Sequence, residues 1–168
     1  MIDFKADVLP LKNRLYRLAL RITLHTGEAE DIVQETMVRV WEHRAELDGP
    51  HSAEAYSLTI CRHLALDWLA RKESHNEALN EALHQQADST ASPQQQMERQ
   101  DGLAWVEKLL NQLPEKQRTI MQLRDIEGKS YKEIADTLSV SEEQVKVTLF
   151  RARQRIKAQF EKISHYGL

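Results

Sequence analysis

The sequence has 168 residues, of which 41% are hydrophobic and 29% charged, a balance typical of a globular chain with one ordinary domain or two small ones. No apolar run approaches the roughly 20 residues that a membrane-spanning helix needs, and the charged N-terminus leads us to expect no signal peptide. The single cysteine, Cys61, excludes an internal disulfide, and no Cys/His cluster has zinc spacing. We therefore expect a cytoplasmic protein with no metal, no cofactor and no membrane insertion of its own. Five glycines, four prolines and few alternating stretches predict an all-α fold.

Three amphipathic helices are predicted in the first part of the chain. The first has apolar residues at helical spacing between Leu11 and Ile22, and it ends at Thr26-Gly27. The second runs from about Glu28 to Arg44, and its apolar face is formed by Ile32, Val33, Met37, Val40 and Trp41. The third runs from about Ala53 to Lys72, after a turn at Asp48-Gly49-Pro50.

Two features of these helices bear on whether the chain has a catalytic or metal-binding site. Asp31 and Glu35 lie four residues apart on the polar face of the second helix, as a pair of catalytic or metal-binding carboxylates would. No histidine accompanies them at ligand spacing, so we expect a solvated face or a docking face for another protein. Cys61 lies on the apolar side of the third helix, where a small core residue is expected rather than a reactive thiol.

The segment 74–100 has a different composition, rich in Gln, Glu, Ala, Ser and Asn and poor in large apolar residues. Six carboxylates against one arginine give the stretch 73–101 a net charge of −5. Such a segment cannot bury a core, so we predict a flexible acidic linker, with a composition that allows some helix over 76–83. The chain is thereby divided into two small helical domains, residues 1–73 and 101–168.

The second domain is predicted to begin with a helix whose apolar residues run from Leu103 to Leu113. Pro114 then opens a further helix with an apolar side at Ile120, Met121 and Leu123. Gly128 fits the left-handed position that follows a helix end.

Two capping boxes then predict a short helix, a turn and a second helix. Ser130 is followed three residues later by Glu133, and Ser141 by Gln144. The second helix has an apolar face of Val145, Leu149, Ala152 and Ile156. It also carries positive charge at Lys146, Arg151, Arg153, Arg155 and Lys157. Two interpretations compete: a helical hairpin with a solvated basic face, and a helix-turn-helix that places its second helix in a DNA major groove. The caps, the spacing and the charges together favour DNA binding, although a net charge of only +3 over 129–168 predicts weak binding by this domain alone.

Three stretches in this order resemble the sigma-70 family of RNA polymerase sigma factors. AEDIVQETMVRVW at 29–41 and AYSLTICRHLALDWLARKE at 55–73 resemble successive helices of the family's promoter-melting domain. The stretch 110–156, with its LP-x-x-QR and SY-x-EIA…VK…RAR runs, resembles the family's C-terminal domain. The length, with two domains and a linker, is that of the extracytoplasmic-function (ECF) group.

The resemblance implies a protein without catalytic activity, which binds core RNA polymerase through its beta and beta′ subunits and directs it to promoter DNA. It further implies control by an anti-sigma factor and an acidic linker that threads the RNA path of the polymerase. The residues implied to face the polymerase are Asp31, Gln34, Glu35 and Arg39. The residues implied to hold the melted −10 strand or its upstream edge are His51, Ser52, Tyr56, Arg62, His63, Arg71 and Lys72.

In the C-terminal domain the resemblance assigns DNA contacts to the second helix of the motif and to residues that precede the motif. The residues implied to contact the −35 element are Ser141, Gln144, Lys146, Val147, Phe150, Arg151 and Arg153, and Phe150 fits a core position equally well. Arg118 and Lys129, with Arg153, are candidates for phosphate contacts, which position a protein on DNA without specifying sequence.

Two other functions are weaker interpretations of the same residues. A helix-turn-helix regulator without sigma activity explains 130–159 but not the first 73 residues, and it usually needs a dimer face, for which no heptad stretch is present. A protein-binding helical adaptor explains the negative net charge but not the arginines of the last helix. An enzyme has no supporting motif here.

Overall fold

The computed structural model describes residues 2–78 and 102–165, and these residues are helical apart from short connections, with no strand among them. The N-terminal region contains the π-helical turn η1 (Phe4–Val8), the 3-10 turns η2 (Leu9–Leu11) and η3 (Arg44–Glu46), and the helices α1 (Lys12–Thr23), α2 (Thr26–Glu42) and α3 (Gly49–Ala78). The C-terminal region contains α5 (Gly102–Asn111), α6 (Glu115–Met121), the π-helical turn η5 (Gln122–Ile126), α7 (Tyr131–Leu138) and α8 (Glu142–His165). The predicted all-α fold is confirmed.

The boundary between α1 and α2 lies earlier than the sequence indicates. Leu24 ends α1 in the left-handed conformation (φ 58°), and its amide donates to the Leu20 carbonyl at 2.7 Å. His25 then caps α2, because its Nδ1 accepts from the Glu28 amide at 3.1 Å. Gly27 therefore lies inside the first turn of α2 and does not interrupt a helix.

Helix α3 is longer than predicted at both ends. It begins at Gly49, whose φ of 78° favours a residue without a side chain, and Pro50 fits the first turn, where no amide donor is needed. It ends at Ala78, so the first five residues of the predicted linker are helical. The rest of that segment, 79–100, lies outside the described residues.

The turn and the two helix starts that the sequence predicts for the C-terminal region are all present. Gly128 has φ 72°, in the left-handed position expected after a helix end. The capping box of α7 forms between Ser130 and Glu133, with both hydrogen bonds at 3.1 Å. The equivalent box of α8 forms between Ser141 and Gln144, at 3.0 and 3.1 Å. Both helices of the predicted helix-turn-helix are therefore present.

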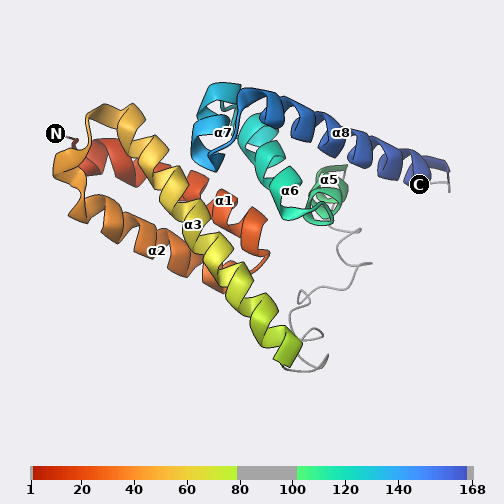
Figure 1. Cartoon of the computed structure of the whole chain (residues 1–168), viewed down its shortest axis with the longest axis horizontal. Coiled ribbons are helices and arrows are strands. Elements are labelled where there is room, and N and C mark those ends of the chain that lie inside the picture. The colour runs from red at the N-terminus through yellow and green to blue at the C-terminus, as the bar shows by residue number, and fades with distance from the viewer. Residues whose placement is uncertain (1, 79–101, 166–168) are drawn as a thin grey trace.

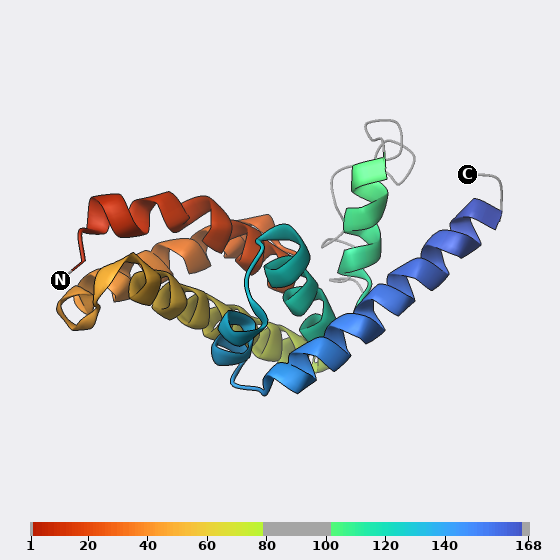
Figure 2. The same cartoon turned by 90° about the horizontal axis from the view of Figure 1, so that it is seen from above.

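The two regions pack against each other and share one buried core. In the views of Figures 1 and 2, α6 lies beside α1, α7 lies beside α3, and α8 leads away from the N-terminal region. Leu15, Leu18 and Ile22 of α1 are fully buried in the same apolar cluster as Ile120 and Leu123 of the C-terminal region. A smaller cluster, which includes Ile2, Val8 and Val40, closes the other end of the N-terminal region. None of the described helices combines the length and the apolar character that crossing a bilayer requires.

Candidate nucleic-acid interface

The exposed side of α8 presents the residues that the sequence assigns to DNA. Val145, Leu149 and Ala152 face the core and are at most 2% exposed. On the other side, Phe150 is 64% exposed and Val147 47%. Of the two interpretations of Phe150, the core position is therefore wrong, and an aromatic ring stands on the surface of the helix. Ser141, Gln144, Lys146 and Arg151 are also exposed.

Arg153 is exposed too, but its guanidinium is held by another part of the same chain. Its Nε donates to Asp125 Oδ2 at 3.2 Å, and a second nitrogen donates to the other carboxylate oxygen. These hydrogen bonds, and then the negative charge of Asp125, raise the pKa of Arg153. This bidentate pair joins α8 to η5, so Arg153 fixes the position of the helix in this arrangement.

An aromatic and cationic group beside the start of α8 was missed from the sequence. The Tyr131 ring lies 4.3 Å from the Arg124 guanidinium and 5.3 Å from the Lys146 ammonium, measured to the ring centroid. Arg124 also donates to the Lys129 carbonyl at 2.9 Å. Arg124 therefore adds a second cation beside the ring that Lys146 also contacts. No spacing within the helix-turn-helix predicts this group, because Arg124 belongs to the preceding turn η5.

Two of the three predicted phosphate contacts, Arg118 and Lys129, are not available in this arrangement. Arg118 is 8% exposed and Lys129 is 9% exposed. The Arg118 guanidinium donates to main-chain carbonyls, and Lys129 forms an ion pair with Glu54 of α3. Burial lowers the pKa of both side chains. A phosphate contact needs an exposed cation, so that assignment is contradicted here: both residues join the two regions.

On α2, the residues assigned to the polymerase form one exposed polar stripe. Asp31, Gln34 and Glu35 are exposed, and Arg39 pairs with Glu35 at 3.1 Å, one turn along. Beside the stripe lies a hollow of about 350 Å³ between α1 and α2. It is lined by Lys12, Asn13, Tyr16, Glu30, Val33 and Gln34. In the described ranges, no group of three or more His, Cys, Asp or Glu side chains is placed to hold a metal ion.

The residues assigned to the −10 element are spread along α3 rather than gathered in one place. His51 and Ser52 lie in its first turn, and Tyr56 one turn further, with its ring 5.8 Å from that of His43. His63 is exposed in the middle of the helix, on the face that Ser52 and Tyr56 share by their spacing. Arg62 lies beside it, half-buried, and its Nε is buried without a hydrogen-bond partner in the described part of the chain.

At the far end of α3, Arg71 is exposed, and the Lys72 ammonium lies 5.0 Å from the Trp68 ring. From His51 to Lys72 the helix rises roughly 30 Å at about 1.5 Å per residue. These residues are therefore spread over the length of α3 rather than gathered in a single pocket.

Trp41, predicted to be an apolar residue of the core face, is 48% exposed. Phe4 meets its ring edge-on at 5.3 Å, and the Arg44 guanidinium stacks 3.7 Å from its centroid. The i, i+3 spacing of Trp41 and Arg44 at a helix end is the signal that was overlooked.

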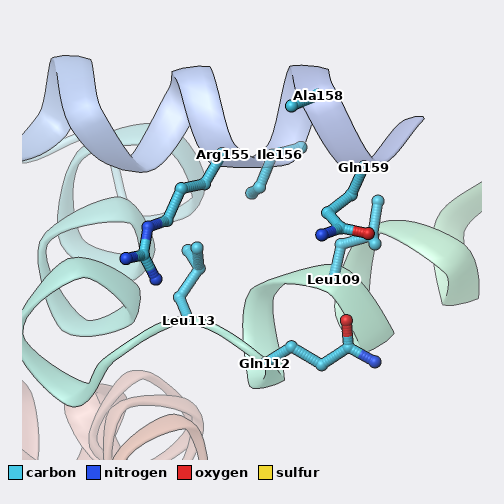
Figure 3. A pocket seen from close by; sticks show the side chains of 7 residues that line it. All are labelled: Leu109, Gln112, Leu113, Arg155, Ile156, Ala158 and Gln159. Atoms are coloured by element: carbon cyan, nitrogen blue, oxygen red, sulfur yellow. The ribbon is translucent and has the colours of Figure 1, made fainter. Parts of the chain in front are cut away.

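A second hollow, of about 190 Å³, separates α5 from the later part of α8. Figure 3 shows Arg155 pointing from α8 toward Leu113, with Ile156 and Leu109 along the hollow. The positive charge of Arg155 therefore lies on the side of α8 that faces α5, away from Phe150.

Comparison with known proteins identifies two family regions in the chain. The models of Sigma-70 region 2 and Sigma-70 region 4 match residues 8–75 and 103–156. The ECF RNA polymerase sigma factor SigM of Bacillus subtilis is 30% identical over 89% of this chain and 90% of its own length. The ECF sigma factor SigE of Mycolicibacterium smegmatis is 33% identical over 86% of this chain. RfaY of Xanthomonas campestris pv. campestris, described as a probable RNA polymerase sigma factor, is 32% identical over 89% of this chain. The chain spans 56% of SigE and 38% of RfaY.

Solved structures show the same fold. The sigma factor RpoE of Bartonella quintana, determined with the anti-sigma factor NepR, superposes with a TM-score of 0.75 at 22% identity, over 95% of this chain and 97% of that one. CnrH, determined with the cytosolic domain of CnrY, superposes with a TM-score of 0.66 at 21% identity, over 95% of this chain and 88% of that one. The chain therefore belongs to the ECF group of the sigma-70 family of RNA polymerase sigma factors.

Proposed function

We propose that this chain is an alternative sigma factor: it binds core RNA polymerase and directs promoter recognition, DNA melting and the initiation of transcription. The observation that carries the proposal is the presence, on one chain, of a capped recognition helix with an exposed basic and aromatic face and of a separate polar stripe on α2. A regulator that reads DNA alone has no use for the second surface. The protein acts without catalytic activity of its own, in the cytoplasm.

The N-terminal and C-terminal regions have different roles in this proposal. In the C-terminal region, α8 reads the −35 element through Lys146, Val147, Phe150 and Arg151, because these side chains are exposed on the face opposite the core. In the N-terminal region, the residues of α3 that were assigned to the −10 element hold the melted strand. Asp31, Gln34 and Glu35 of α2 contact the polymerase, and the beta and beta′ subunits are the proposed partners.

An anti-sigma factor is a further proposed partner. Support comes from family membership, and from the solved relatives RpoE and CnrH, the first of which was determined with an anti-sigma factor. Such a partner would act by covering the surfaces that polymerase and promoter need.

A transcription assay tests the proposal directly. Purified protein is combined with core RNA polymerase of its own host and a library of promoter DNA. Defined transcripts that need both proteins are expected, and they also report the promoter sequence. Specific duplex binding by the protein alone, without transcripts, would instead identify a helix-turn-helix regulator.

A further inference from the structure

One flank of α8 is fastened to the elements that precede it in the chain. Lys146 and Arg153 lie seven residues apart, about two turns of a helix, so they share one line along α8. The Lys146 ammonium lies 5.3 Å from the centroid of the Tyr131 ring on α7. Arg153 Nε donates to Asp125 Oδ2 of η5 at 3.2 Å, and Arg153 Nη2 donates to the other carboxylate oxygen. This flank of α8 therefore faces α7 and η5.

Arg153 lies at the boundary between the buried and the exposed faces of α8. Leu149 and Phe150 precede it by four and three residues, so they lie on either side of it one turn earlier. Leu149 is 2% exposed and belongs to the core, whereas Phe150 is 64% exposed. Apolar packing is not directional, so the core contacts leave the rotation of α8 about its own axis loosely defined. A bidentate fork is directional, so the contact with Asp125 defines that rotation.

The contribution of this pair is to geometry rather than to stability. The Arg153 side chain is 50% exposed and that of Asp125 is 33% exposed, so water competes for both groups. Ion pairs at such exposure add little to the free energy of unfolding, although bidentate geometry still orients the two partners. The capping boxes at Ser130 and Ser141 act only on their own helices. The pair joins positions 28 residues apart, so it supplies an orientation that these local signals do not.

The same pair argues against a direct DNA contact by Arg153. Two of its guanidinium nitrogens already donate to Asp125. The carboxylate cancels the charge of the guanidinium, and it repels a phosphate that approaches the same place. Phosphate contacts gain their free energy from a cation that displaces counterions from the DNA, which a neutral pair does not do. Arg153, which the sequence assigns to the −35 element and to a phosphate, therefore differs from the exposed Lys146 and Arg151.

We propose that Arg153 is a positioning residue for promoter recognition: through Asp125 it fixes the rotation of α8 at which Phe150 and Arg151 meet the −35 bases. Contacts to base edges carry the sequence information, and their hydrogen bonds need donor–acceptor distances of about 2.7–3.2 Å. A helix that turns about its own axis loses these distances first. The pair therefore determines sequence discrimination more than total affinity. The inference rests on the proposed function for the role of DNA, whereas the pair itself is independent of that function.

The first measurement asks whether the pair forms in the free full-length chain. NMR follows the exchange of the Arg153 Nε proton with water, because this proton is donated to Asp125. We expect it to exchange more slowly than the Nε proton of the exposed Arg151, and we expect Asp125→Asn to remove most of the difference. Asp136→Asn, which removes an exposed carboxylate of α7, is the matched control and leaves the exchange unchanged. Equal exchange at Arg151 and Arg153 in the wild type would overturn the proposal.

The second measurement compares the affinity of the holoenzyme for a promoter duplex and for the same duplex with scrambled −35 bases. The ratio of the two affinities reports sequence discrimination. Asp125→Asn is expected to lower this ratio about two- to fivefold, the size of effect that exposed ion pairs have, while Asp136→Asn leaves it unchanged. A phosphate contact by Arg153 predicts a different result. Removal of the carboxylate would then free the guanidinium, so the affinity for both duplexes would rise at a constant ratio, contrary to the proposal.

Arg153→Lys separates the geometry of the fork from its charge. Lysine keeps the positive charge that a phosphate contact needs, but its ammonium does not reproduce the planar bidentate geometry. Positioning predicts that Arg153→Lys lowers the ratio as much as Asp125→Asn does, and that the double variant loses no more than either single variant. Arg155→Lys makes the same change on the flank that faces α5 (Figure 3) and is expected to leave the ratio unchanged. An unchanged ratio in Arg153→Lys would show that the charge matters and the fork does not.

The salt dependence of binding gives an independent check. Each phosphate contact contributes about one to the slope of log affinity against log salt concentration. We expect Arg153→Gln to keep the slope of the wild-type holoenzyme while it lowers the ratio of affinities. A slope reduced by about one would identify Arg153 as a phosphate contact and contradict its role as a positioning residue. Circular dichroism confirms that each variant is folded, as the exposure of the pair leads us to expect.

The outcomes distinguish this inference from the proposed function. A holoenzyme that binds the promoter with the same ratio in the wild type, Asp125→Asn and Arg153→Lys leaves the proposed function standing and overturns the positioning role. A chain that reads duplex DNA without polymerase, and that loses discrimination in both variants, overturns the proposed function and supports the positioning role.

Discussion

The guanidinium of Arg118 donates to the main-chain carbonyl of Ile22, 96 residues earlier in the chain, at 2.7 Å. This bond joins α6 of the C-terminal region to the end of α1 in the N-terminal region without any side-chain partner on α1. An arginine that satisfies carbonyls in this way is sensitive to replacement, since the carbonyls of the helix end are left without donors.

Replacement of Arg118 by alanine is expected to lower the free energy of unfolding by about 2–4 kcal/mol, because three hydrogen bonds from a charged group to buried carbonyls are lost. Urea denaturation followed by circular dichroism measures the change. Lys116→Ala, an exposed position on the same helix, is the control and should shift the midpoint little. Equal midpoints for the two variants would show that the contacts of Arg118 with the end of α1 are not populated in solution.

The stability of the folded chain is expected to depend on pH through Glu127, whose carboxylate accepts from Arg17 Nε and Nη2 of α1 at 2.8 and 2.7 Å. The pKa of Glu127 is lowered in the folded chain, so its ionised carboxylate stabilises the folded state at pH values above the unfolded carboxyl pKa, about 4.3. This contribution is lost as the pH falls through the lowered pKa of the folded chain. The difference in unfolding free energy between wild type and Glu127→Gln should therefore be full at neutral pH and shrink below about pH 4.3. Denaturation of both proteins from pH 7 to pH 3.5 measures it, and a difference that does not change with pH would contradict this role for Glu127.

Local features of the fold were predictable, because a few neighbouring residues decide them. The capping boxes at Ser130 and Ser141 and the left-handed Gly128 were read correctly, since each signal lies within four residues of its partner. The start of α2 was placed too late, because a histidine cap at His25 is not among the usual N-cap residues.

Features that depend on distant residues were not predictable. Arg118 and Lys129 were interpreted as surface cations, which is the common state of such residues, and only the packing of the two regions reveals their buried partners. Trp41 was assigned to the core because periodicity cannot show that Phe4 and Arg44 cover its ring while one side stays exposed. The contacts between the two regions are likewise not visible in the sequence, since Lys129 and Glu54 lie 75 residues apart (129 − 54) and Arg14 and Glu127 lie 113 apart.

Cys61 is expected to be inert in the folded protein. Its side chain is fully buried, its thiol donates to the Leu15 carbonyl at 3.4 Å, and burial raises its pKa to about 12. The thiolate, which is the reactive form, is therefore scarce at neutral pH. Reaction with a chromogenic disulfide reagent at pH 8 should be slow in buffer and fast in urea, with the rate following unfolding. Rapid stoichiometric reaction in buffer would show that α3 does not pack against α1 as described.

The exposed face of α8 is expected to govern DNA affinity without affecting stability. Lys146→Ala or Arg151→Ala should weaken promoter binding by about 1–3 kcal/mol if the side chain contacts a base, or lower the salt slope by about one if it contacts a phosphate. Lys157→Ala, further along the helix, is the control. Promoter binding by the assembled holoenzyme is titrated at several salt concentrations, alongside thermal unfolding of the free variants. Loss of polymerase binding in step with DNA binding would contradict the division of labour between the regions.

The polar stripe of α2 is expected to govern assembly with the polymerase. Asp31 is exposed and forms no ion pair within the described ranges, so Asp31→Arg leaves the fold intact while it reverses the charge that a partner meets. Like-charge contacts at an interface cost several kcal/mol, which predicts a fall of at least about tenfold in affinity for core polymerase. Gln34→Ala, beside the hollow between α1 and α2, should have a smaller effect of the same sign. Asp136→Arg makes the same charge change on α7 and should leave assembly unaffected, because the polymerase-binding stripe lies on the other region. Affinity is measured by fluorescence anisotropy of labelled protein with core enzyme, and normal assembly by Asp31→Arg would show that α2 is not the docking helix.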